Sequence, residues 1–157
     1  FFGTLQHCFG ARFLCFLWLT YFGLKGFVFT LLDLVELPYF QKVGVSSTEY
    51  QLADLVARIP WSMKGFVGVL SDCVPIGRYH KRGYLLLSSA VGIVGLSALA
   101  VVHPARAGIW PAASLFFSAH AFVSTFDLLC EGKYSEMMRK GGGGPEVLTL
   151  VYTCVQL

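Results

Sequence analysis

Charged side chains are scarce in this chain, yet several of them lie inside long apolar segments. Lys25, Asp33 and Glu36 lie within or at the end of the first such segment, and Arg58 and Lys64 lie within the second. A charge at the centre of a bilayer costs about 2.5–3.5 kcal/mol on insertion scales, so charged groups there face a protein interior or a water-filled cavity. In such surroundings a cation can bind an anionic substrate, and a partly buried carboxylate can carry a proton.

Helical periodicity gives the charges of the first segment a common face. At about 100° per residue, Lys25 and Glu36 fall within roughly 20° of each other, and Asp33 falls within roughly 80° of Lys25. Two interpretations of Lys25 remain open: it contacts a substrate, or it forms a structural ion pair with Asp33 or Glu36. Asp33 is also a candidate carrier of a proton.

The fourth apolar segment and the charged stretch after it add further ionisable groups. Asp127 lies one turn before the end of that segment, and Glu131 and Lys133 follow it. Asp127 is a second candidate carrier of a proton, while Glu131 and Lys133 either take part in binding or solvate a helix end. Lys64 either contacts a substrate or pairs with Asp127 or Glu131. For His120, on an otherwise apolar helix, an interior histidine with satisfied hydrogen bonds is favoured over the alternative, a proton relay.

The composition predicts the elements that hold these groups in position. With 55% hydrophobic and 13% charged residues, the chain is too apolar for a soluble domain of 157 residues. We expect an all-α membrane protein with four full transmembrane helices and the start of a fifth. The full spans cover about 13–37, 51–74, 84–102 and 109–129. Residues 147–157 make only about 16 Å of helix, too short for a hydrocarbon core of about 30 Å.

Prolines, glycines and polar residues mark the ends of these spans. Pro38 is expected to end or kink the first helix, and Pro60 to kink the second. Residues 39–50 are predicted to form a polar connection that contains a serine-rich helix cap. Residues 1–12 are predicted to form a short lead-in, and the glycine run 141–144 a flexible linker.

A basic hairpin joins the second and third spans. Gly68 and Asp72 stand before a Pro/Gly turn, and the cations Arg78, Lys81 and Arg82 follow it. Gly68 permits the close approach of a neighbouring backbone, and Asp72 offers a carboxylate to the cations. This layout resembles the loop between the second and third helices of major facilitator transporters. The resemblance implies a gating hairpin that stabilises one of two arrangements of the carrier.

A longer string of residues around the hairpin is more specific. It reads Pro60-Trp61-Ser62-Met63-Lys64-Gly65, then Gly68, Ser71-Asp72, Pro75 and Tyr79-His80-Lys81-Arg82. This string resembles the signature of the folate–biopterin transporter family within that superfamily. Further matches, similar to the kinetoplastid branch of the family, are Tyr21-Phe22, Lys25-Gly26, Tyr50-Gln51 and Asp127-x-x-x-Glu131-Gly132-Lys133-Tyr134. Two positions depart from the pattern: Arg78 stands where the family commonly has glycine, and Gly65 where it often has proline.

The resemblance implies a proton-coupled symporter of folates or pterins, or alternatively of S-adenosylmethionine. The chain would be a fragment of the N-terminal six-helix half of a major-facilitator-type bundle, whose missing C-terminal half completes a site with alternating access. The other alternative is a truncated membrane fragment that does not transport. A folate joins a flat ring system to a dicarboxylate tail, so its site needs aromatic faces and cations. The residues nominated for substrate binding or coupling are Lys25, Asp33, Glu36, Arg58, Trp61, Lys64, Asp127, Glu131 and Lys133.

Basic residues are concentrated on one side of the predicted spans. Arg12, the hairpin and the loop after the fourth span lie on that side, so the positive-inside rule predicts a cytoplasmic N-terminus. We expect the plasma membrane as the location. No nucleophile–base pair or metal-ligand spacing is present, so we expect no enzyme activity, cofactor or metal. The expected partners are the small-molecule substrate, protons and the lipid bilayer, and with a net charge of +3 no nucleic acid.

Overall fold

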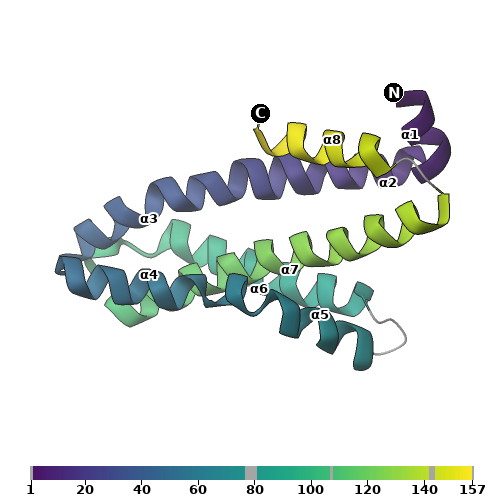
Figure 1. Cartoon of the computed structure of the whole chain (residues 1–157). Coiled ribbons are helices and arrows are strands. Elements are labelled where there is room, and N and C mark those ends of the chain that lie inside the picture. Colours follow the sequence, from purple (N-terminus) through teal and green to yellow (C-terminus); the bar gives the residue numbers. More distant parts are fainter. Residues whose placement is uncertain (1, 77–80, 107, 142–143, 157) are drawn as a thin grey trace. The chain divides into compact units, whose positions relative to one another are not determined.

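The computed structural model describes residues 2–76, 81–106, 108–141 and 144–156 (Figure 1). Within these ranges the chain is almost entirely helical, and none of its elements is a β-strand, in agreement with the predicted all-α class. The elements are α1 (Phe2–Phe9), α2 (Ala11–Trp18), η1 (Leu19–Val28), α3 (Phe29–Val43), α4 (Ser47–Ser62), α5 (Lys64–Cys73), α6 (Lys81–Val101), η2 (Pro104–Arg106), α7 (Ile109–Gly141) and α8 (Gly144–Gln156).

The first long helix extends beyond its predicted limits at both ends. α2, η1 and α3 follow one another from Ala11 to Val43, and the helix passes through Pro38. The predicted end at residue 37 and the predicted polar connection from residue 39 are therefore wrong, and Tyr39 and Phe40 are buried helical residues. The predicted lead-in is also helical: it forms α1, which Gly10, with φ 77°, separates from α2.

The middle of this helix departs from α-helical geometry. η1 is a π-helix of 10 residues that includes Lys25. Its i→i+5 hydrogen bonds widen each turn, so its side chains do not follow the α-helical step of about 100°. The common face predicted for Lys25 and the two acids of α3 therefore rests on a periodicity that η1 does not have.

The second apolar segment forms two helices. α4 has 16 residues and α5 has 10, and the backbone departs from helical geometry at Met63, where φ is −87° and ψ is 3°. The predicted irregularity is thus present, but it follows Pro60 by one turn, and Pro60 itself lies buried inside α4.

Three helices in the described part of the chain are long and apolar enough to cross a membrane. They are Ala11–Val43, Lys81–Val101 and Ile109–Lys140. They correspond to three of the four predicted full spans. The remaining predicted span, about residues 51–74, coincides with α4 and α5. Neither of these two helices is long enough alone to cross a membrane. α7 runs well past its predicted end at residue 129, through the charged stretch, and α8 has 13 residues.

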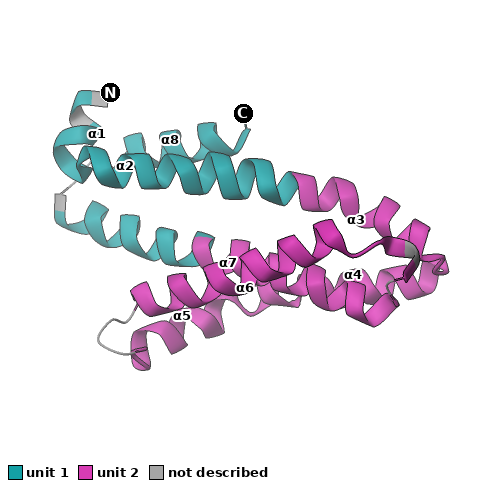
Figure 2. Cartoon of the chain, turned by 180° about the vertical axis from the view of Figure 1, so that it is seen from behind, with its two compact units in different colours: residues 1–30, 127–157 teal, residues 31–126 magenta. Residues whose placement is uncertain are grey.

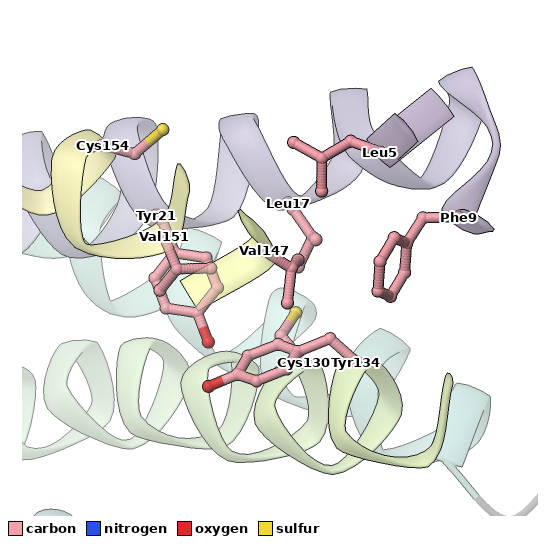
Figure 3. Close-up of a cluster of buried hydrophobic side chains, with 9 residues drawn as sticks. All are labelled: Leu5, Phe9, Leu17, Tyr21, Cys130, Tyr134, Val147, Val151 and Cys154. Carbon is pink, nitrogen blue, oxygen red and sulfur yellow. The ribbon is translucent and has the colours of Figure 1, made fainter. Parts of the chain in front are cut away.

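The chain divides into two compact units (Figure 2). Unit 1 comprises residues 1–30 and 127–157, and unit 2 comprises residues 31–126. Unit 1 has an apolar core drawn from both ends of the chain (Figure 3). Its buried members are Leu5, Phe9, Leu17, Tyr21, Cys130, Tyr134, Val147, Val151 and Cys154. Gly26 lets η1 approach α8 closely, since a Cβ there would lie 3.2 Å from the carbonyl oxygen of Tyr21 and 3.4 Å from that of Cys154.

Unit 2 has its own core, in which aromatic rings join α3 to α7. The Phe116 ring lies 5.5 Å from that of Tyr39 and 5.6 Å from that of Phe40, within the range of favourable aromatic pairs. α6 meets α7 at its glycines, where Gly92 faces the side chain of Phe122. Gly92 is therefore a packing site between α6 and α7. The aromatic packing fixes α3 against α7, and these helices carry some of the charged and polar residues described next.

Candidate functional site

Four charged residues of α3 and α4 form an ionic cluster in unit 2, which we call the Arg58 cluster: Asp33, Glu36, Asp54 and Arg58. Arg58 Nε lies 2.6 Å from Asp54 Oδ1, one helical turn away on α4. Arg58 Nη2 lies 3.0 Å from Asp33 Oδ1 and 3.4 Å from Glu36 Oε2 on α3. One guanidinium therefore serves three carboxylates.

Members of the Arg58 cluster differ in their exposure. The side chains of Arg58, Asp33 and Asp54 are 39%, 38% and 31% exposed, whereas that of Glu36 is 1% exposed. A buried carboxylate is costly unless it is paired or neutralised. Glu36 is thus the group whose charge matters most, although its contact with Arg58 is the longest of the three.

His120 of α7 borders this cluster. Its Nε2 atom lies 3.7 Å from Glu36 Oε2, and its side chain is completely buried. The indole Nε1–H of Trp61 donates a hydrogen bond to His120 Nδ1, with 3.3 Å between the nitrogens. The predicted burial of His120 is confirmed, and its described neighbours include a carboxylate and an indole.

Trp61 also contacts a cation at the break between α4 and α5. The ammonium nitrogen of Lys64, the first residue of α5, lies 5.2 Å from the centroid of the Trp61 ring. That distance is typical of a cation–π interaction. Trp61 therefore connects His120 on one side with Lys64 on the other, within unit 2.

A capping box sets the position of α4. Ser46 Oγ accepts a hydrogen bond from the backbone N–H of Glu49, and the Glu49 carboxylate accepts one from the backbone N–H of Ser46 at 2.8 Å. The serine-rich cap that the sequence predicts is confirmed. The hydrogen bond that the Ser46 backbone N–H donates to the Glu49 carboxylate, and a second one that the Ser46 hydroxyl donates to it at 2.7 Å, hold the pKa of Glu49 below its usual value. Counting from this cap, Asp54, Arg58 and Trp61 lie at helical spacing along α4.

Unit 1 contains a separate ion pair, Lys25 with Asp127, which we call the Lys25 pair. Lys25 Nζ lies 2.9 Å from Asp127 Oδ1 and 3.0 Å from Oδ2, and the Asp127 side chain is 1% exposed. The structural interpretation of Lys25 is therefore correct in kind. The described partner of Lys25 is Asp127, whereas Asp33 and Glu36, the partners predicted for it, bind Arg58.

The gating hairpin is described only in part. Asp72 Oδ1 lies 3.7 Å from Lys81 Nζ, a long ion pair between exposed groups. Arg78 lies outside the described residues, and no described contact tests the predicted roles of Gly68 and Arg82. In unit 1, Lys133 binds Glu136 at 3.1 Å on the surface of α7, which agrees with the solvating alternative, and Glu131 is half-buried.

Donor atoms compatible with a metal ion also occur in the described part of unit 2. Ligand atoms of Asp33, Glu36 and His120 lie within 4.8 Å of one another. The guanidinium of Arg58 already contacts both carboxylates, so we assign no metal to them. Sequence reasoning did not select Asp54, although its spacing of four residues before Arg58 is a signal for an ion pair on one helix.

Comparisons with known proteins identify relatives of this chain. A sequence model of the BT1 family matches residues 25–157. "Probable folate-biopterin transporter 4" of Arabidopsis thaliana is 35% identical over 92 residues, which are 57% of this chain and 18% of the relative. "Probable folate-biopterin transporter 2" of the same plant is 34% identical over 64 residues, 40% of this chain and 13% of the relative. "Probable folate-biopterin transporter 5" is 32% identical over 74 residues, 46% of this chain and 15% of the relative.

The family model covers most of the chain, whereas the three relatives match 40–57% of the chain and a small part of their own length. Each matched segment spans less than a fifth of the curated relative. No solved structure matches this chain. The kinetoplastid-like branch stays a prediction, whereas the predicted family is confirmed because its model matches well over half of the residues. The chain belongs to the BT1 family.

Proposed function

We propose that the native protein containing this sequence carries folates or pterins across a membrane. Three apolar helices and the family assignment indicate an integral, multi-pass membrane protein. The names of the three relatives, all folate-biopterin transporters, support the substrate class. The observation that carries the proposal is the meeting of Trp61 and Lys64 at the break between α4 and α5.

The chemistry at this break suits the proposed substrate. Broken helices are where secondary carriers bind their substrates, because the break frees backbone groups and exposes the positive end of the second helix. The Trp61 ring offers a face to a pterin ring, and the Lys64 ammonium offers a charge to a carboxylate tail. Folate has both parts, whereas biopterin has the ring alone.

A partial major-facilitator-type bundle fits the helices of this chain. In this proposal α4 and α5 together form the second of four spans, and α8 is the start of a fifth. These helices belong to the first of two six-helix halves, which rock about a midplane site and expose it to each side in turn. The hairpin of Asp72 and Lys81 stabilises one of the two arrangements. The N-terminus lies in the cytoplasm, and the plasma membrane is the proposed location.

Uptake of labelled folate and biopterin by cells expressing the native protein that contains this sequence tests the proposal. Lys64→Gln removes the cation for the tail but keeps the Trp61 ring. We expect folate uptake to fall more than about tenfold, a loss of about 1.4 kcal/mol, and biopterin uptake to change little. Lys42→Gln is the matched control, because Lys42 is an exposed lysine at the end of α3.

Two results would contradict parts of this proposal, the first its substrate class and the second the role of Lys64. One is uptake of S-adenosylmethionine with none of folate or biopterin, which would favour the alternative substrate. The other is an equal loss of folate and biopterin uptake in Lys64→Gln, because Lys64 would then not recognise the tail.

A further inference from the structure

The Arg58 cluster has an excess of negative charge beside a buried carboxylate. Its described members supply three carboxylates and one guanidinium. The two shorter contacts of Arg58, at 2.6 and 3.0 Å, go to the more exposed acids Asp54 and Asp33. Glu36, which is fully buried, receives the contact of 3.4 Å. The carboxylate in greatest need of a counter-charge is thus the one that Arg58 neutralises least.

His120 does not supply the second positive charge in the arrangement seen here. An indole nitrogen can only donate a hydrogen bond, so the Trp61 contact requires a lone pair on His120 Nδ1. With Nδ1 unprotonated, the imidazole is neutral and carries its hydrogen on Nε2, the atom that lies 3.7 Å from Glu36. Trp61 therefore fixes both the charge and the tautomer of His120.

We propose that Glu36 and His120 form a proton-binding site, and that Trp61 connects this site to the substrate. In the arrangement seen here a proton from water binds the Glu36 carboxylate, which becomes a neutral acid. When a substrate ring draws the Trp61 indole away, His120 Nδ1 gains a free lone pair and takes a proton from water. The resulting imidazolium faces Glu36, which can then release its own proton to water. This inference rests on the proposed function for its substrate, but not for the proton site itself.

All described charged and titratable neighbours of Glu36 are consistent with this assignment. Asp33 lies on the same helix, Arg58 and Asp54 lie on α4, and His120 lies on α7. Tyr50 of α4 is also within electrostatic reach of Glu36. Arg58 is the only one of these with a permanent positive charge. The sequence nominated Asp33 and Asp127 as proton carriers, but Asp33 is well exposed and the Lys25 ammonium neutralises Asp127.

Spectroscopy on the chain in lipid nanodiscs tests the site without any substrate. Infrared difference spectra between neutral and alkaline pH should contain the carbonyl band of a protonated carboxylic acid. We expect that band to disappear in Glu36→Gln and to remain in Glu146→Gln, a control at the start of α8. A band that persists in Glu36→Gln and disappears in Asp33→Asn would overturn the assignment to Glu36.

Nitrogen NMR of the histidine rings tests the role of Trp61. The chain has four histidines, so the His120 signals are assigned by their loss in His120→Gln. We expect His120 to be the neutral Nε2–H tautomer at neutral pH. In Trp61→Phe, which keeps a ring but removes the donor, His120 should become charged at higher pH than in the wild type. An unchanged titration in Trp61→Phe would overturn the connection.

Transport measurements separate this inference from the proposed function. Glu36→Gln should abolish accumulation driven by a proton gradient but retain exchange of labelled for unlabelled substrate at equal concentrations. Loss of both activities in Glu36→Gln, with a normal fold, would overturn the role of Glu36 as a proton carrier. Absence of both activities in the wild type would count against the proposed function and leave the spectroscopic result standing.

Discussion

The Lys25 pair and the Arg58 cluster solve the same problem in different ways. Both hold an acidic side chain that is only 1% exposed in helices rich in apolar residues. Asp127 binds one ammonium group through both of its oxygens, at 2.9 and 3.0 Å, so its charge is matched. Glu36 shares one guanidinium with two other carboxylates, so its charge is not matched.

This difference separates a structural ion pair from a group that can change its state. A matched buried pair is lost only at a large cost, because breaking it leaves an uncompensated charge. An unmatched carboxylate has another way to become neutral, which is to bind a proton. From this comparison we infer that the buried Asp127 of unit 1 holds helices together through its ion pair, and that the buried Glu36 of unit 2 can gain or lose a proton.

Removing the cation of the Lys25 pair should have the largest effect. Lys25→Met leaves Asp127 buried without its ammonium partner and should lower the free energy of unfolding by about 3–5 kcal/mol. Chemical denaturation in bicelles, followed by circular dichroism, measures this loss. Lys42→Met is the control for the lysine itself. The double variant Lys25→Met/Asp127→Leu should recover much of the loss, and a failure to do so would mean that Lys25 acts through something other than this pair.

Removing the cation of the Arg58 cluster should have a smaller effect that depends on pH. Arg58→Met should lower the free energy of unfolding by about 1–3 kcal/mol at neutral pH, because a protonated Glu36 does not need the counter-charge that Arg58 supplies. The loss should shrink as the pH falls. The same denaturation measurement at several pH values checks this, and a loss as large as that of Lys25→Met at every pH would erase the distinction between the two regions.

Glu49, an exposed carboxylate, serves as the reference for the two buried acids, Asp127 and Glu36. The pKa of Glu49 is lowered from its usual 4.5, so Glu49 stabilises the fold above that pH and loses this contribution as the pH falls through the lowered value. Glu49→Gln should therefore unfold slightly more easily than the wild type at neutral pH, and equally easily at a pH well below 4.5. Melting temperatures at the two pH values measure the difference. A difference that persists in acid would show that the charge of Glu49 is not its cause.

Local signals in the sequence correctly predicted the helical class, the family and the cap of α4. The string from Pro60 to Arg82 is contiguous, so it identifies a family without any knowledge of tertiary contacts. The cap at Ser46 is equally local and is correct. The prediction that the first helix ends at Pro38 is wrong because a helix in an apolar setting can pass through proline when its neighbours satisfy the freed groups.

Partners distant in sequence could not be predicted in the same way. Lys25 and Asp127 are 102 residues apart, and nothing in a helical period relates them. The π-helix η1 also invalidates the angular count that assigned Lys25 to the acids of α3. His120 was judged by its apolar helix alone, whereas its surroundings come from α3 and α4.

The order of the Arg58 cluster along the chain has a consequence for how the protein enters the membrane. Asp33 and Glu36 lie on α3, and Asp54 and Arg58 lie on α4, the next helix, after a connection of residues 44–46. Inserted alone, each charge would cost about 2.5–3.5 kcal/mol. As a pair, the two helices bring acids and guanidinium together before α7 is synthesised. We therefore expect the translocation machinery to release α3 into the bilayer together with α4 rather than ahead of it.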